Sequence, residues 1–162
     1  METINGLPAH ILLIHAVVVL IPLTALLAIV NSVWRPAREC LVWLVLALAV
    51  IAMILTPITS EAGEWLERRT EESAALENHT ELGEWGNWIA AGVLVVAIAL
   101  AALHVLEKRS GKRNTIATIV VAVLAVVIGV GAMIGIYRIG DSGATAVWGD
   151  VDLSQVSGEG GE

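Results

Sequence analysis

The sequence predicts an all-α integral membrane protein, a four-helix bundle with both termini on the non-cytoplasmic side. Of its 162 residues, 57% are hydrophobic and only 15% are charged, whereas soluble domains carry about 25% charged residues. The apolar residues form four long runs rather than an amphipathic pattern. Each run is close to the ~20 residues that cross ~30 Å of hydrocarbon. Because backbone groups find no water there, each run must be helical.

The expected elements follow in chain order. The first run has no basic region ahead of it and no small-residue cleavage site, so we expect it to be retained rather than removed as a signal peptide. Between the second and third runs lies an outer acidic loop, 60–86, whose first half suits a helical extension. The transmembrane domain is therefore 1–153, and the polar tail 154–162 is expected to be disordered. The predicted helices cover approximately residues 9–30, 40–59, 87–106 and 115–137.

The distribution of charge predicts the orientation. Three cations, Arg68, Arg69 and Arg138, lie on the face that carries the acidic loop, while the other six lie on the two short turns. Lys and Arg concentrate on the cytoplasmic side of membrane proteins, so the short turns are expected inside and the acidic loop outside. Fourteen of the sixteen acids share the outer face, and this acidity excludes a nucleic-acid partner. The first partner expected is the lipid bilayer.

The fourth run contains a small-residue motif that favours close helix contacts. Gly131 and Gly135 form a GxxxG pattern, and such residues let helix backbones approach each other in lipid. We favour packing within the bundle. The alternative is an oligomer that associates through Gly131 and Gly135.

Ionisable residues gather at the outer face, where runs one and three begin and runs two and four end. His15 lies about one turn inside the first run, and an ionisable residue there is expected to face protein. His15 and His79 come from facing helices at similar depth and could be the axial ligands of haem b. Gly83, one turn after His79, could leave room for the macrocycle, and Glu64 could accept the free imidazole N–H.

Two other interpretations stay open for the same outer face. Imidazoles and carboxylates on facing helices could instead hold a divalent metal ion. The histidines could also be interfacial residues of a structural or interaction subunit without a cofactor. No catalytic motif is present, so we do not expect an enzyme in isolation. The candidate ligands of the metal site are His10, His15, Glu61, Glu64, His79 and Asp141.

Four stretches of the chain resemble a known family. They read GLPAHILLIHAVVVLIPL, LTPITSEAGEWLE, HTELG and YRIGDSGATAVW, and they resemble the bacterial membrane family catalogued as domain of unknown function 2231. The resemblance runs from Asn5 to Trp148 and implies a multi-pass protein of the bacterial plasma membrane. Similar units are sometimes fused to a Rieske-type iron–sulfur domain, which implies redox work.

The resemblance also bears on the site and the function. The resemblance implies that the motif histidines are His15 and His79 and that the acid of the second helix is Glu64, whereas Asp141 stands where relatives often have histidine. The function expected is that of a haem-binding electron-transfer or respiratory-accessory component with a redox partner in the membrane. The alternatives are a structural subunit without a cofactor and a divalent-metal-binding membrane protein.

Overall fold

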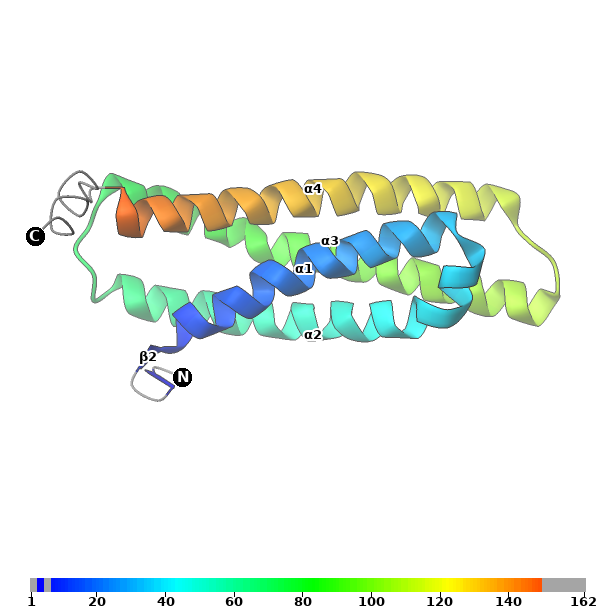
Figure 1. Cartoon of the computed structure of the whole chain (residues 1–162), viewed down its shortest axis with the longest axis horizontal. Helices are drawn as coiled ribbons and strands as arrows, with labels where there is room; N and C mark the ends of the chain where they lie inside the picture. Colours follow the sequence, from blue (N-terminus) through cyan, green and yellow to red (C-terminus); the bar gives the residue numbers. More distant parts are fainter. Residues whose placement is uncertain (1–2, 5–6, 150–162) are drawn as a thin grey trace, which may run out of the picture.

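The computed structural model describes residues 3–4 and 7–149 and consists almost entirely of four long helices (Figure 1). The predicted tail 154–162 lies outside the described residues. All four helices are long and apolar enough to cross a membrane, so the all-α membrane fold is confirmed. Two short strands, β1 (Thr3–Ile4) and β2 (Leu7–Pro8), pair antiparallel ahead of the first helix. The helices are α1 (Ala9–Val33), α2 (Arg35–Glu67), α3 (Ala74–Ser110) and α4 (Thr115–Trp148).

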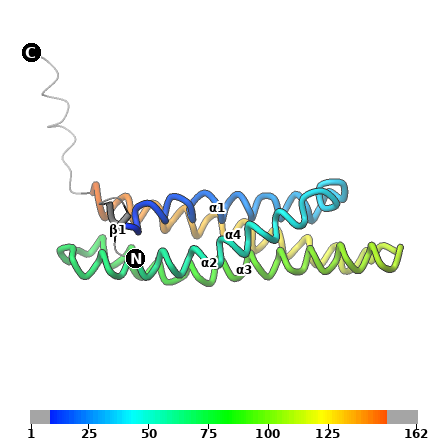
Figure 2. Tube along the Cα trace, turned by 90° about the horizontal axis from the view of Figure 1, so that it is seen from below, coloured from blue at the N-terminus to red at the C-terminus, as the bar shows by residue number. Residues whose placement is uncertain are grey.

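The helices run side by side and antiparallel in chain order, and α4 returns to pack against α1 (Figures 1 and 2). One end of the bundle, called here the acidic end, holds the starts of α1 and α3 and the ends of α2 and α4. The other, the basic end, holds the turn at Trp34 and the turn at residues 111–114. The structure does not assign either end to a side of the membrane, so the orientation stays a prediction.

The helices extend well beyond the apolar runs. Helix α3 has 37 residues and is therefore about 55 Å long at 1.5 Å per residue, against ~30 Å of hydrocarbon. The loop predicted over 60–86 is mostly helical, because α2 continues to Glu67 and α3 begins at Ala74. The Ser73 side chain caps α3 by accepting from the Leu76 N–H. Hydropathy predicted the membrane spans but not the ends of the helices.

The glycines of α4 divide between the interior and the surface. A Cβ on Gly135 would lie 2.6 Å from Ile89 Cδ1 of α3, and a Cβ on Gly129 would lie 2.9 Å from Ile29 Cδ1 of α1. Gly131 is exposed and would meet nothing within 4 Å. Packing within the bundle therefore accounts for Gly135, whereas Gly131 faces outward.

Polar contacts between helices lie mainly near the two ends. At the basic end the buried Arg38 donates to Glu107 at 2.7 Å, and Thr118 donates to the same carboxylate at 3.3 Å. These bonds connect α2, α3 and α4. Among the described residues, no side-chain hydrogen bond joins α1 to α4. At the α1–α4 seam, Gly129 packs against Ile29.

Candidate functional site

Two histidines meet at the acidic end of the bundle. His10 lies in the first turn of α1 and His79 in the second turn of α3. Both are half-buried, and their ring centroids are 6.5 Å apart with the planes inclined at 72°. These two side chains form the candidate site, called here the imidazole pair.

The His10 ring is anchored to the helix that follows its own. Its Nδ1 lies 2.9 Å from the backbone carbonyl oxygen of Thr59 in α2. Because a carbonyl oxygen only accepts hydrogen bonds, Nδ1 must carry the proton. The neutral ring therefore presents an unprotonated Nε2 with a free lone pair.

His79 is anchored in the same way, through Ser142 of α4. Its Nδ1 lies 2.9 Å from Ser142 Oγ, and this hydroxyl donates its single proton to the carbonyl of Ile139 at 2.9 Å. The serine oxygen must then accept from the imidazole, which places the proton on Nδ1. Both histidines therefore have Nε2 as the nitrogen available to a ligand.

A glycine on a neighbouring helix makes room for each ring. A Cβ on Gly63 of α2 would lie 3.0 Å from His10 Cε1, and a Cβ on Gly143 of α4 would lie 3.0 Å from His79 Cε1. Any larger residue at either position would press on the imidazole. The sequence analysis named neither glycine, although both occur in the stretches that carry the family resemblance.

The surroundings of His79 favour its neutral form. This residue precedes the apolar run that begins near residue 87, so it lies outside the membrane-spanning stretch. Burial lowers the pKa of His79 below its usual 6.5, and the neighbouring His10 lowers it further. The Ile139 carbonyl and Glu67 act in the opposite direction. Glu67 is held beside the pair by a 3.1 Å hydrogen bond from Thr80 Oγ1. A neutral imidazole is the form that binds a metal.

The structure brings only two of the predicted ligands together. His15 is exposed, and its Nδ1 is bonded to the carbonyl of Ile11 one turn earlier in α1. Glu64 is also exposed and lies 3.8 Å from Arg68. A Cβ on Gly83 would have nothing within 4 Å.

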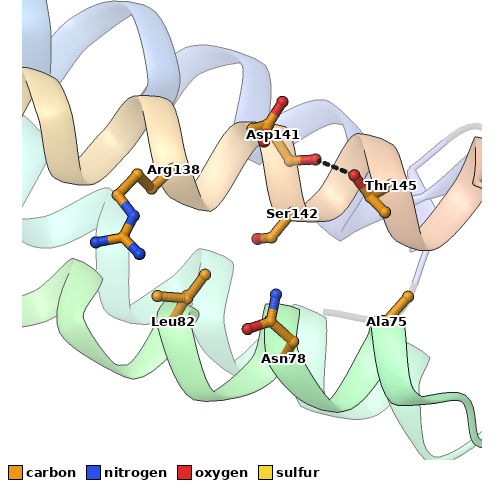
Figure 3. A pocket seen from close by; sticks show the side chains of 7 residues that line it. All are labelled: Ala75, Asn78, Leu82, Arg138, Asp141, Ser142 and Thr145. Atoms are coloured by element: carbon orange, nitrogen blue, oxygen red, sulfur yellow. Dashed lines mark hydrogen bonds between the residues drawn. The ribbon is translucent and has the colours of Figure 1, made fainter.

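The remaining predicted metal ligands lie apart as well. Glu61 is exposed, and the carboxylate of the exposed Asp141 turns away from α3 (Figure 3). Within residues 3–4 and 7–149, no three His, Cys, Asp or Glu side chains are grouped so that they could hold a metal ion. The imidazole pair supplies two donors.

Comparison with known proteins gives one match. The family described as "Predicted membrane protein (DUF2231)" matches residues 6–151 of the chain. No curated protein and no solved structure matches.

Proposed function

We propose, from the premise that this chain belongs to the DUF2231 family of predicted membrane proteins, that its acidic end binds haem b through His10 and His79. In the predicted orientation this end faces outward, where the protein would serve as an electron-transfer or respiratory-accessory component. The observation that carries the proposal is the pair of Nδ1-anchored rings, each with a free Nε2.

The number of donors favours haem over a bare metal ion. A haem iron takes four nitrogens from its macrocycle and needs the protein for at most two axial ligands. A zinc ion takes three or four protein ligands, and no group of three suitable side chains occurs in the described part of the chain. Two imidazoles therefore match the requirement of haem b.

The spacing of the rings agrees with the donor count. The ring centroids of His10 and His79 are 6.5 Å apart, so the two imidazoles lie close enough to hold one group together. Their planes are inclined at 72°, and two imidazoles that bind one metal centre need not be parallel.

Hydrogen-bond partners of the two imidazoles would hold them ready to bind the haem. The Thr59 carbonyl and the Ser142 hydroxyl fix the tautomer and orientation of the two rings, as the hydrogen-bond partners of ligating histidines commonly do. These groups occupy the position that the sequence analysis gave to Glu64. When bound, a b-type haem supplies one-electron transfer, and its exchange partner would be another redox protein of the membrane.

An absorption spectrum of the purified protein, reconstituted with haem, tests the proposal. The oxidised and dithionite-reduced protein should show a Soret band and split visible bands. His10→Ala and His79→Ala should lose these bands or convert the haem to a five-coordinate form. His15→Ala is the matched control, because this exposed residue lies on the same helix as His10 and should leave the spectrum unchanged. Glu64→Gln should also have no effect.

Three results would contradict the proposal. If wild-type protein binds no haem, the pair has another role. If His15→Ala removes the bands while His10→Ala does not, the haem site is built on the other histidine of α1. If the protein instead retains stoichiometric zinc, iron or manganese and shows no Soret band, the divalent-metal interpretation is correct.

A further inference from the structure

A polar cleft lies on the outside of the bundle between α3 and α4, next to the imidazole pair (Figure 3). Its volume is about 200 Å³. Helix α3 supplies one wall and α4 the other. The lining residues are Ala75, Asn78 and Leu82 of α3 and Arg138, Asp141, Ser142 and Thr145 of α4.

The cleft presents hydrogen-bond donors that the protein does not use. The guanidinium of Arg138 extends toward α3 near Leu82, and Asn78 lies one turn earlier on α3 with its amide nitrogen directed toward Ser142 of α4 (Figure 3). Within the described residues, neither side chain makes a hydrogen bond or an ion pair. Asp141, three residues after Arg138 on α4, directs its carboxylate away from α3 (Figure 3). A guanidinium without an ion-pair partner, in the same cleft as a free amide N–H₂, suits a phosphate group.

The position of the cleft along α4 points to a lipid as the source of that phosphate. Arg138 directly follows Tyr137, the last residue of the apolar run, whose side chain is 71% exposed. Trp85 of α3 and Trp148 of α4 are also exposed near this end, and such aromatic side chains mark the boundary between hydrocarbon and water. The phosphates of a bilayer lie at this boundary.

The helix surface below the cleft suits the rest of a lipid molecule. One turn before Arg138, Ile134 is 56% exposed, and Val130 one turn further is also exposed. Acyl chains of a lipid held at the cleft would descend along these apolar side chains. The Ser142 and Thr145 hydroxyls already donate to backbone carbonyls, so Arg138 and Asn78 remain as the donors for the ligand.

We propose that this cleft binds the phosphodiester of a phospholipid in the leaflet at the acidic end. Arg138 donates two hydrogen bonds to the phosphate oxygens, Asn78 donates a third, and the acyl chains follow the exposed surface of α4. The cleft adjoins the imidazole pair through Ser142, which lines it and anchors His79, but neither Arg138 nor Asn78 belongs to the pair.

Native mass spectrometry of delipidated protein in detergent tests the proposal. Phosphatidylglycerol and phosphatidylcholine should both bind, because both carry the phosphodiester, whereas diacylglycerol with the same acyl chains should not. Arg138→Gln should weaken phospholipid binding by roughly tenfold or more, as expected for the loss of charge-assisted hydrogen bonds. Arg109→Gln is the matched control, an exposed arginine at the basic end. Arg138→Lys, which keeps the charge but not the fork, should bind with intermediate affinity.

The other outcomes overturn the proposal in distinct ways. If diacylglycerol binds as well as the phospholipids, the phosphate is not recognised. If inorganic phosphate occupies the site and phospholipids do not, the cleft binds a free anion. If Arg138→Gln retains wild-type affinity while its thermal unfolding is unchanged, the lipid binds elsewhere on the bundle.

Discussion

Two glycines four residues apart on α4 lead to a sharp prediction about how the bundle is held together. Gly135→Leu should destabilise the folded protein, whereas Gly131→Leu should not. Both substitutions replace glycine by leucine in the same helix. A Cβ at residue 135 would lie 2.6 Å from Ile89 Cδ1, whereas a Cβ at residue 131 would meet nothing within 4 Å.

The expected magnitude follows from two opposing effects. Replacing glycine inside a helix contributes up to about 1 kcal/mol of stability through helix propensity. At residue 131 this effect acts alone, so the variant should equal the wild type or exceed it slightly. At residue 135 an ordinary contact would need the Ile89 methyl to retreat by about 1 Å for a Cβ alone, and overpacking of this kind costs about 1–3 kcal/mol, or more. Three further carbons place Leu at the upper part of that range. Gly135→Leu should therefore be about 2 kcal/mol less stable than the wild type. Because the propensity gain is common to both variants, it should be about 3 kcal/mol less stable than Gly131→Leu, roughly 150-fold in the unfolding equilibrium.

Reversible unfolding in dodecylmaltoside micelles with increasing sodium dodecyl sulfate measures this difference. Tryptophan fluorescence and circular dichroism follow the transition, and size-exclusion chromatography with light scattering gives the oligomeric state of each variant. Equal destabilisation by both substitutions would refute the packing argument. A Gly131→Leu variant that changes from a dimer to a folded monomer would instead identify the exposed glycine as part of an oligomer interface.

Three further predictions concern charge and orientation. The pKa of His79 should lie below 6.5 in an NMR titration; the unfolded chain then takes up the proton first, so stability should fall as the pH drops below about 6.5, and His79→Gln should abolish this loss. Arg38→Ala should cost about 3–5 kcal/mol because it leaves a largely buried Glu107 unpaired, whereas the double variant Arg38→Met/Glu107→Met should recover most of that loss in the same unfolding assay. In a cysteine-free background, Ser73→Cys should react with an impermeant thiol reagent on intact cells and Ser110→Cys should not; the opposite pattern would place the acidic end in the cytoplasm.

The membrane fold followed from the apolar runs, but the rotation of each helix did not. Depth alone suggested that His15 faces His79. Helical phase distinguishes the two histidines of α1: His10 precedes the buried Val17 by seven residues, two helical turns, whereas His15 precedes the exposed Val19 by four. The sequence alone does not give this distinction, because it depends on which face of α1 is buried in the bundle.

The anchors of the imidazole pair were less accessible to sequence reasoning. The bond from His10 to the Thr59 carbonyl depends on the axial register of α1 against α2. The sequence does not show this register, because every carbonyl of a helix is chemically alike. Ser142 was not distinguishable from other small polar residues near helix ends. Gly63 and Gly143 have a clearer signal, since a glycine within a helix lowers its stability and suggests a packing requirement. The sequence placed the candidate residues at one end of the bundle, and tertiary register determined which of them meet.

The α1–α4 seam differs from the other contacts between neighbouring helices in how it is held together. Elsewhere, separating neighbouring helices breaks hydrogen bonds or ion pairs between side chains, such as those from His10 to α2 and from Arg38 to α3. Along the described part of the α1–α4 seam no such bond has to break, and hydrocarbon tails are as apolar as the side chains they would replace. We therefore expect the first and last helices to separate more readily than the other neighbouring pairs when the bundle loosens within the bilayer.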